Sequence, residues 1–225
     1  FWILDDITPL QQLTSEVTNS EVHLFSPRPA YRFHFVEAPM SQRGDTVTGK
    51  NPPYGASIHY YLKSAPEGPV EIDIVDETGK TIRSLKGSKK PGINRVWWNL
   101  RTERTTEVKL RTPPQYAPYF ELGNDGWRPL PTFGQGRMAI LAPPGTYTVN
   151  LKLGDEEQSQ ELEVRKDPNS SGTLADVEEQ TNLLLAVGDE INKVADLINQ
   201  IEWIREQIAH LDAMVEKDEA TEAIL

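Results

Sequence analysis

Alternating apolar and polar positions run through residues 57–166 and predict β-strands, because successive side chains of a strand point to opposite faces of a sheet. Three segments each predict one buried face: Ile58, Tyr60 and Leu62; Val70, Ile72 and Ile74; and Tyr147, Val149, Leu151 and Leu153. Trp98 is predicted to lie in the core, whereas its neighbour Trp97 is predicted to point outward. Short strands and tight turns without intervening helices predict two antiparallel sheets packed as an immunoglobulin-like or fibronectin type III-like β-sandwich over residues 21–168.

The segments on either side of this alternation are less regular. Residues 21–25 and 31–37 are predicted to close the edges of the sheets, and residues 1–20 are expected to be a linker or the end of an upstream domain. A stretch rich in Pro, Tyr and Gly between residues 102 and 144 predicts a large insertion between two strands, with room for a hairpin of its own. Long loops of this kind are usually functional, so the insertion is the first place to look for a binding surface.

After the turn residues 167–172 the apolar residues recur every three or four positions, which predicts an amphipathic helical tail over residues 173–225. Thr173 and Ser171 are the candidate N-caps. The predicted interface positions of the helix are Leu184, Val187, Ile191, Val194, Ile198, Ile201, Ile208 and Leu211. Leu197 and Ile204 widen this stripe, and Val215 continues it over some 40 residues, about 60 Å at 1.5 Å per residue.

A stripe with a period near 3.5 favours another helix as its partner. The partner is predicted to be either a second copy of the chain or a returning helix that begins near Glu219. The alternative is that the helix lies against the sandwich along part of its length.

The charge of the chain belongs mostly to this tail. The formal net charge is −11, and residues 173–225 contribute −10 of it through 13 acidic residues against Lys193, Arg205 and Lys217. This balance argues against nucleic acid as a partner. No apolar run approaches the roughly 20 residues that cross a bilayer, so no membrane span is expected.

The residues that carry chemistry are sparse. The chain has no cysteine, which excludes thiol catalysis, disulfides and cysteine-based zinc sites. Its four histidines are scattered, and no nucleotide-binding or hydrolase motif is present. We therefore expect no metal, no cofactor and no catalytic residue, and the chain is expected not to be an enzyme.

Aromatic residues are the candidates for ligand binding, namely Trp97, Tyr116, Tyr119 and Trp127. Exposed rings of this kind stack on sugars or anchor a protein interface. They can equally hold the insertion on the sandwich, and the sequence leaves these alternatives open.

Several segments resemble the region that follows the propeller in large bacterial sortilin-like, BNR-repeat β-propeller proteins, often labelled as glycosyl hydrolases. These segments are 24–28 (LFSPR), 49–56 (GKNPPYGA), 94–101 (NRVWWNLR) and 143–147 (PPGTY), and residues 1–10 (FWILDDITPL) resemble the last strand of the propeller itself. The resemblance spans nearly the whole chain and implies an exported parent protein, periplasmic, outer-surface or secreted, with a propeller before residue 1. The Asp-box signature of those propellers is absent, so any hydrolase activity of the parent is expected outside this chain.

These observations predict a non-catalytic accessory and interaction module of a larger exported β-propeller protein. It is expected to pack on the propeller and to mediate assembly through its helix. The chain opens without an initiator Met, as expected for a piece of a longer protein. The alternative function is a carbohydrate-binding module attached to a glycosidase, with a glycan as the partner.

Overall fold

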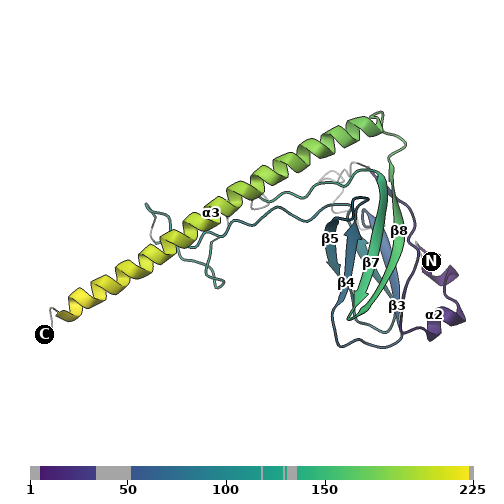
Figure 1. Cartoon of the computed structure of the whole chain (residues 1–225), viewed down its shortest axis with the longest axis horizontal. Coiled ribbons are helices and arrows are strands. Elements are labelled where there is room, and N and C mark those ends of the chain that lie inside the picture. The colour runs from purple at the N-terminus through teal and green to yellow at the C-terminus, as the bar shows by residue number, and fades with distance from the viewer. Residues whose placement is uncertain (1–5, 34–51, 118, 129, 131–135, 223–225) are drawn as a thin grey trace, which may run out of the picture. The chain divides into compact units, whose positions relative to one another are not determined.

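The chain forms two compact units in a computed structural model that describes residues 6–33, 52–117, 119–128, 130 and 136–222 (Figure 1). The first unit comprises Phe1–Glu103 and Ile140–Thr181, and the second comprises Arg104–Ala139 and Asn182–Leu225. We call residues 104–139 the insertion segment.

Two β-sheets make up the first unit. The smaller sheet has the order β1-β3-β6, and its strands are β1 (Val22–Leu24), β3 (Ala56–Leu62) and β6 (Gly92–Trp98). The larger sheet has the order β2-β8-β7-β4-β5, and its strands are β2 (Ala30–Arg32), β8 (Glu156–Lys166), β7 (Gly145–Leu153), β4 (Val70–Val75) and β5 (Thr81–Lys86). The predicted sandwich-like, mainly β architecture with a C-terminal helix is confirmed.

One strand departs from the predicted antiparallel pairing. β2 runs parallel to β8, with Ala30 opposite Val164, while the other strand pairs are antiparallel. A strand of three residues is too short to carry an alternation, so the sequence pattern gave no information about its direction. The predicted edge strand at 21–25 is confirmed as β1, and residues 34–37 of the other lie outside the described residues.

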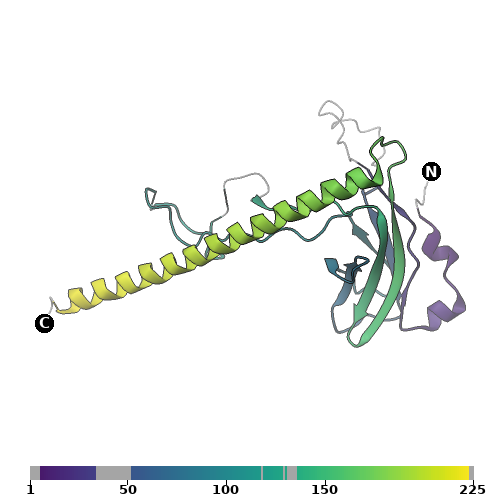
Figure 2. The same cartoon turned by 45° about the horizontal axis from the view of Figure 1, so that its top comes forward.

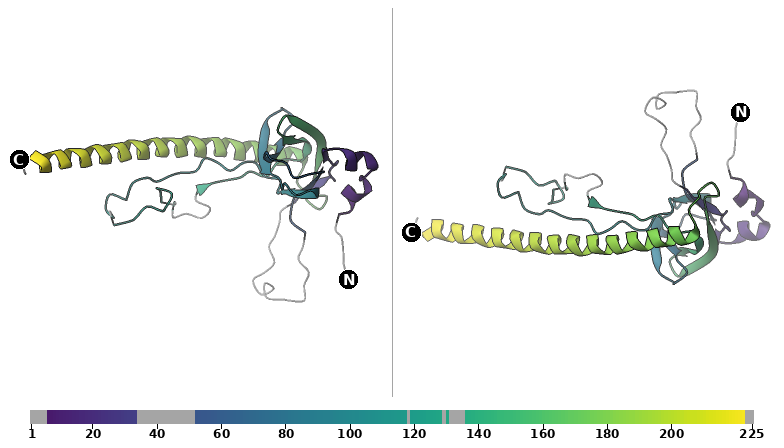
Figure 3. Two further views of the ribbon diagram at one scale, coloured as in Figure 1. Left: turned by 90° about the horizontal axis from the view of Figure 1, so that it is seen from below. Right: turned by 90° about the horizontal axis from the view of Figure 1, so that it is seen from above.

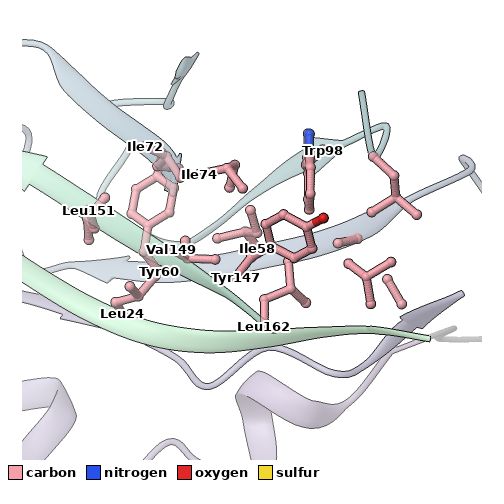
Figure 4. Close-up of a cluster of buried hydrophobic side chains, with 14 of the residues drawn as sticks. Leu24, Ile58, Tyr60, Ile72, Ile74, Trp98, Tyr147, Val149, Leu151 and Leu162 are labelled. Carbon is pink, nitrogen blue, oxygen red and sulfur yellow. The ribbon is translucent and has the colours of Figure 1, made fainter. Parts of the chain in front are cut away.

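The core lies between the inner faces of the two sheets (Figure 4). Trp98 is fully buried, its ring packs edge-on against Tyr147 at 5.2 Å, and its indole Nε1 donates to the carbonyl of Arg101. Tyr60 is also fully buried and donates its hydroxyl to the carbonyl of Ser88 at 2.6 Å. Burial raises the pKa of Tyr60 to about 12. The three predicted buried faces are confirmed except at Leu153, which is only partly buried at the end of β7.

The N-terminal residues cover the outer face of the smaller sheet. Helices α1 (Thr8–Gln11) and α2 (Ser15–Asn19) bury Pro9 and Val17 (Figure 2). The carboxylate of Asp6 accepts from Ser57 Oγ of β3 at 3.1 Å and from the Thr8 backbone N–H at 3.0 Å. Residues 1–10 are expected from the resemblance to form a propeller strand. Phe1–Asp5 lie outside the described residues, but the strand is wrong for Thr8–Leu10, because Pro9 in the first turn favours a helix start there.

The predicted insertion begins and ends on a short antiparallel pairing within the first unit. The Thr102 backbone N–H donates to the Ile140 carbonyl at 2.9 Å, and the Ala142 N–H donates to the Leu100 carbonyl at 2.7 Å. The excursion between these ends is the insertion segment, slightly shorter than the predicted 102–144.

Helix α3 (Leu174–Glu222) starts at the predicted cap. Thr173 Oγ1 accepts from the Asp176 N–H, and the Asp176 carboxylate accepts from the Thr173 N–H at 2.7 Å, so the two residues form a capping box. Thr173 is therefore the N-cap rather than Ser171. The helix continues to Glu222, so the returning helix expected to begin near Glu219 is wrong.

We predict that the first unit loses stability as the pH falls below about 6.5, through His59 of β3. Burial lowers the pKa of His59 below its ordinary value of 6.5, and Arg95 lowers it further, against the opposing charge of Asp6. The unfolded chain therefore takes up this proton at a higher pH than the folded chain, and the free energy of unfolding decreases with falling pH. His59→Gln is expected to flatten the profile between pH 7.5 and 5 in denaturant titrations.

His210→Gln is the control, because His210 is exposed on α3 and lies outside the first unit. The pKa of His23 on β1 is also lowered by burial, so some slope is expected to persist in His59→Gln. An unchanged slope in His59→Gln would contradict the prediction.

Candidate functional site

The second unit joins the insertion segment to the part of α3 that follows Asn182. Figure 3 shows the teal insertion running beside the helix in both of its views. Its outward arm, residues 104–113, is extended but forms no regular strand. Backbone N–H and C=O groups need hydrogen-bond partners wherever water is excluded. The partners of this arm therefore show what holds the second unit together.

Two asparagines of α3 bind the outward arm through its backbone. Asn192 Oδ1 accepts from the Thr106 N–H at 2.7 Å. Asn199 Oδ1 accepts from the Lys109 N–H at 2.8 Å, and its Nδ2 donates to the Glu107 carbonyl at 2.9 Å. The Asn199 amide thus makes both hydrogen bonds that a neighbouring β-strand would make.

The spacing of the two asparagines matches the rise of the extended arm. Seven residues from Asn192 to Asn199 advance a helix by roughly 10.5 Å. Three residues from Thr106 to Lys109 advance an extended chain by roughly 10 Å. Helix and arm therefore stay in register over two turns of the helix. This register explains why two asparagines seven residues apart bind the amides of Thr106 and Lys109, which are three residues apart.

Glu202 anchors the far end of the arm. Its side chain is only 4% exposed, and Oε2 accepts from the Arg111 N–H, the Thr112 N–H and the Thr112 hydroxyl at 2.7–3.0 Å. Its other oxygen, Oε1, accepts from Arg205 at 2.5 Å. Burial alone would raise the pKa of Glu202, but the hydrogen bonds from Thr112 and Arg111 and the charge of Arg205 outweigh it and lower the pKa.

The other edge of the outward arm pairs with the returning part of the insertion segment. The Thr105 N–H donates to the Met138 carbonyl at 2.8 Å, and the Arg128 N–H donates to the Leu110 carbonyl at 2.9 Å. Arg128 Nε also donates to the Thr112 carbonyl at 3.2 Å. The outward arm therefore lies between the helix and the return arm, with hydrogen bonds on both edges.

The helix face beneath the arm carries small side chains. Gly188 and Ala195 are buried on the same line of the helix as Glu202, at intervals of seven residues. Small residues let a second backbone approach a helix closely. An open pocket of about 550 Å³ lies beside Ala195, lined by Thr106 and Val108 of the insertion segment and by the helix residues Val187, Glu190, Ile191, Val194 and Ile198.

Aromatic and cationic side chains close this end of the unit. The Arg111 guanidinium lies over the ring of Trp203 at 4.1 Å and 5.9 Å from the ring of Trp127. Lys109 lies over the same Trp127 ring at 4.1 Å. These cation–π contacts stabilise the anchor around Glu202.

The predicted interface stripe of α3 is divided by the insertion segment. Leu184, Ile191 and Ile198 are half-buried, and the last two line the pocket beside the insertion segment together with Val187 and Val194. The other five predicted positions stay exposed, from 43% at Val187 to 62% at Leu211. With their exposed neighbours they form a continuous line that we call the seam. Its apolar members are Leu183, Val187, Val194, Leu197, Ile201, Ile204, Ile208, Leu211 and Val215.

The four predicted ligand-binding aromatics are not brought together as one site. Trp97 is a half-buried residue of β6 in the first unit, with the Arg95 guanidinium 5.5 Å from its ring. Trp127 is occupied by Lys109 and Arg111, as described above. Tyr116 and Tyr119 are 90% and 79% exposed in the second unit, so these two rings are the most exposed of the four.

Asn192, Asn199 and Glu202 were missed by the analysis of the sequence. Polar residues of a helix are normally taken as its solvent face. A pattern in the sequence could have identified them. Asn recurs after seven residues, next to the small residues Gly188 and Ala195 at the same spacing, and small residues in a row indicate that another segment packs on that face of the helix.

Comparisons with protein-family models, with curated proteins and with solved structures find no match to this chain. In the described part of the chain, no helix has the length and apolarity of a membrane span. The same residues contain no group of three His, Cys, Asp or Glu side chains arranged to hold a metal ion. The functional conclusion rests on the geometry of the two units.

We predict that Glu202→Ala releases the outward arm from the helix. The change leaves the Arg111 N–H and both Thr112 donors without their acceptor, at a cost of about 3 kcal/mol, or roughly 100-fold in the opening equilibrium. Trypsin cleavage after Lys109 and Arg111 is expected to accelerate by that factor, provided that the arm opens and closes faster than the protease cleaves it. Asp196→Ala, an exposed acidic residue of the same helix, is the control, and equal rates in both variants would contradict the anchor.

The attachment of the outward arm through Glu202 is also expected to depend on pH. Because the pKa of Glu202 is lowered in the folded chain, its stabilisation is complete above the ordinary value of 4.5 and is lost as the pH falls through the lowered value. We expect cleavage by an acid-active protease within the arm to rise over that range. Glu202→Gln removes this titration and is expected to leave a flatter profile, and a profile as steep as that of the unchanged chain would overturn the assignment.

Proposed function

We propose that the chain is a non-catalytic assembly module, in which the β-sandwich carries a braced helix and the helix associates with a second copy of the chain through the seam. The single observation that carries this proposal is the exposure of nine large apolar side chains in one continuous line on α3. Exposed apolar patches of this extent are typical of interaction sites in soluble proteins.

The seam is large enough for a stable dimer. Full burial of such a side chain contributes about 1.5–3 kcal/mol, so burying the exposed half contributes about 1 kcal/mol each, or roughly 18 kcal/mol for two chains. Loss of translational and rotational freedom costs about 4–15 kcal/mol. The difference brackets the roughly 8 kcal/mol that corresponds to a micromolar dissociation constant.

The insertion segment supports the proposal by bracing the helix. A long helix with little packed against it frays and bends, because most helical stability in proteins comes from tertiary packing. The hydrogen bonds to Asn192, Asn199 and Glu202 hold an extended arm against one face of α3. The seam side chains stay 43–66% exposed, and Val187 and Val194 among them also line the pocket beside the insertion segment. A brace that leaves the seam exposed is what an assembly surface requires.

We also propose that the sandwich is of the immunoglobulin kind. The orders β1-β3-β6 and β5-β4-β7-β8 correspond to the strand orders A-B-E and C′-C-F-G of that fold, with β2 added at one edge. Tyr147, near the start of β7, donates its hydroxyl to the Pro143 carbonyl at 2.7 Å, as a tyrosine corner does. The insertion segment would then occupy the connection between strands E and F.

The wider setting of the module follows from the sequence resemblance alone. On that basis we propose an exported parent protein with a β-propeller before this region, on which the sandwich packs. Any catalytic activity would belong to the propeller. The module itself would act by placing two copies of the parent side by side.

The proposal predicts that the chain self-associates and that Ile201→Glu prevents it. Ile201 is 47% exposed at the middle of the seam, and two carboxylates facing each other there are expected to weaken the association about 100-fold or more. Light scattering over a concentration series measures the mass. Leu185→Glu is the matched control, because Leu185 is an exposed apolar residue of the same helix that lies off the seam. A monomer at all concentrations in the unchanged chain would overturn the proposal.

A further inference from the structure

The seam consists of two rows with a strict seven-residue repeat. The first row is Val187, Val194, Ile201, Ile208 and Val215, and the second is Leu183, Glu190, Leu197, Ile204 and Leu211. These rows occupy the a and d positions of a heptad, and a repeat of 3.5 residues per turn winds two helices into a left-handed coiled coil. From this pattern we infer that two copies of the chain pair along α3 as a parallel, in-register, two-stranded coiled coil, an inference that rests on the proposed self-assembly.

The residue types in the two rows select this arrangement. Every member of the first row is β-branched, and three of the five members of the second row are leucine. In parallel coiled coils, β-branched residues at a with leucine at d favour two strands over three or four. The seam from Leu183 to Val215 spans nearly five heptads, roughly 48 Å of helix.

Charges beside the seam agree with a parallel pairing. In a parallel dimer each g position faces the e position that follows it on the partner, which pairs Lys193 with Ile198, Gln200 with Arg205, and Gln207 with Asp212. None of these pairs brings like charges together. The acidic residues Asp189, Asp196 and Glu206 fall at the c and f positions, away from the contact.

The insertion segment leaves room for a second helix. It is bound along the line of Gly188, Ala195 and Glu202, the b positions of the heptad, and through Asn192 and Asn199 at f positions. The a and d rows stay exposed over most of their length, and Val187, Glu190 and Val194 at the N-terminal end of the rows also line the pocket beside the insertion segment. Each helix of the dimer therefore keeps its own insertion segment on its outer side.

Glu190 is the exception among the d positions. In a parallel dimer it faces its own counterpart, and like charges at that distance oppose association. Lys193 donates to Glu190 Oε1 at 2.7 Å within the same helix and offsets part of this repulsion. Glu190→Leu is therefore expected to tighten the dimer about tenfold, whereas Asp189→Leu, which removes the same charge one residue away at a c position, is expected to leave the dissociation constant unchanged.

Single cysteines test the arrangement directly, because the chain contains none of its own. In a parallel, in-register dimer two copies of residue 201 face each other, so the full chain carrying Ile201→Cys is expected to form a disulfide-linked dimer under mild oxidation. Asp196→Cys, exposed at a c position, is expected to stay largely uncrosslinked. The mass of each chain is measured in parallel under reducing conditions.

Each result separates this inference from the proposed function. A reversible dimer that crosslinks through residue 201, and that Glu190→Leu tightens, supports both. A dimer that does not crosslink at residue 201, or a trimer, overturns the parallel two-stranded arrangement and leaves self-assembly through the seam standing. A monomer in the chain with Glu190→Leu, at concentrations up to a millimolar, overturns both.

Discussion

The second unit depends on one constraint, which is that the peptide groups of an extended segment need hydrogen-bond partners. The outward arm of the insertion segment has no strand on the side that faces α3. Asn192, Asn199 and Glu202 supply the missing acceptors, and Asn199 also supplies a donor. A helix can serve an extended chain in this way only if its side chains recur at the rise of that chain, and a spacing of seven residues meets this condition.

This arrangement gives the helix two faces with different partners. Its polar and small face is occupied by the chain's own insertion segment, and its apolar face is left as the seam. Glu202 lies between the two faces. It binds the end of the arm, and its neighbours in the sequence, Ile201 and Ile204, belong to the seam. One of the aromatic residues predicted to bind a ligand belongs to this bracing, since Lys109 lies over the Trp127 ring and Arg111 lies 5.9 Å from it.

The sequence predicted those parts of the structure that a repeat encodes. Alternation identified the buried faces of β3, β4 and β7, and the period of three to four residues identified α3 and most of the seam. β2 was not predicted in its parallel direction, because three residues carry no period. The role of Asn192 and Asn199 was missed because a hydrogen bond from a helix side chain to a distant backbone leaves no pattern in the arm itself. Ile191 and Ile198 were assigned to the interface because the helical pattern alone does not reveal what covers each side of a stripe.

Bracing and pairing of α3 are both tested by hydrogen–deuterium exchange of the full chain at two concentrations, one below and one above the dissociation constant of the dimer. We expect slow exchange of the Thr106, Lys109, Arg111 and Thr112 amides at both concentrations, because their acceptors lie within the same chain. Residues 183–215 of α3 are expected to exchange more slowly only at the higher concentration, because pairing suppresses opening of the helix. Fast exchange of the arm amides at both concentrations, or a helix whose exchange does not change with concentration, would contradict these expectations.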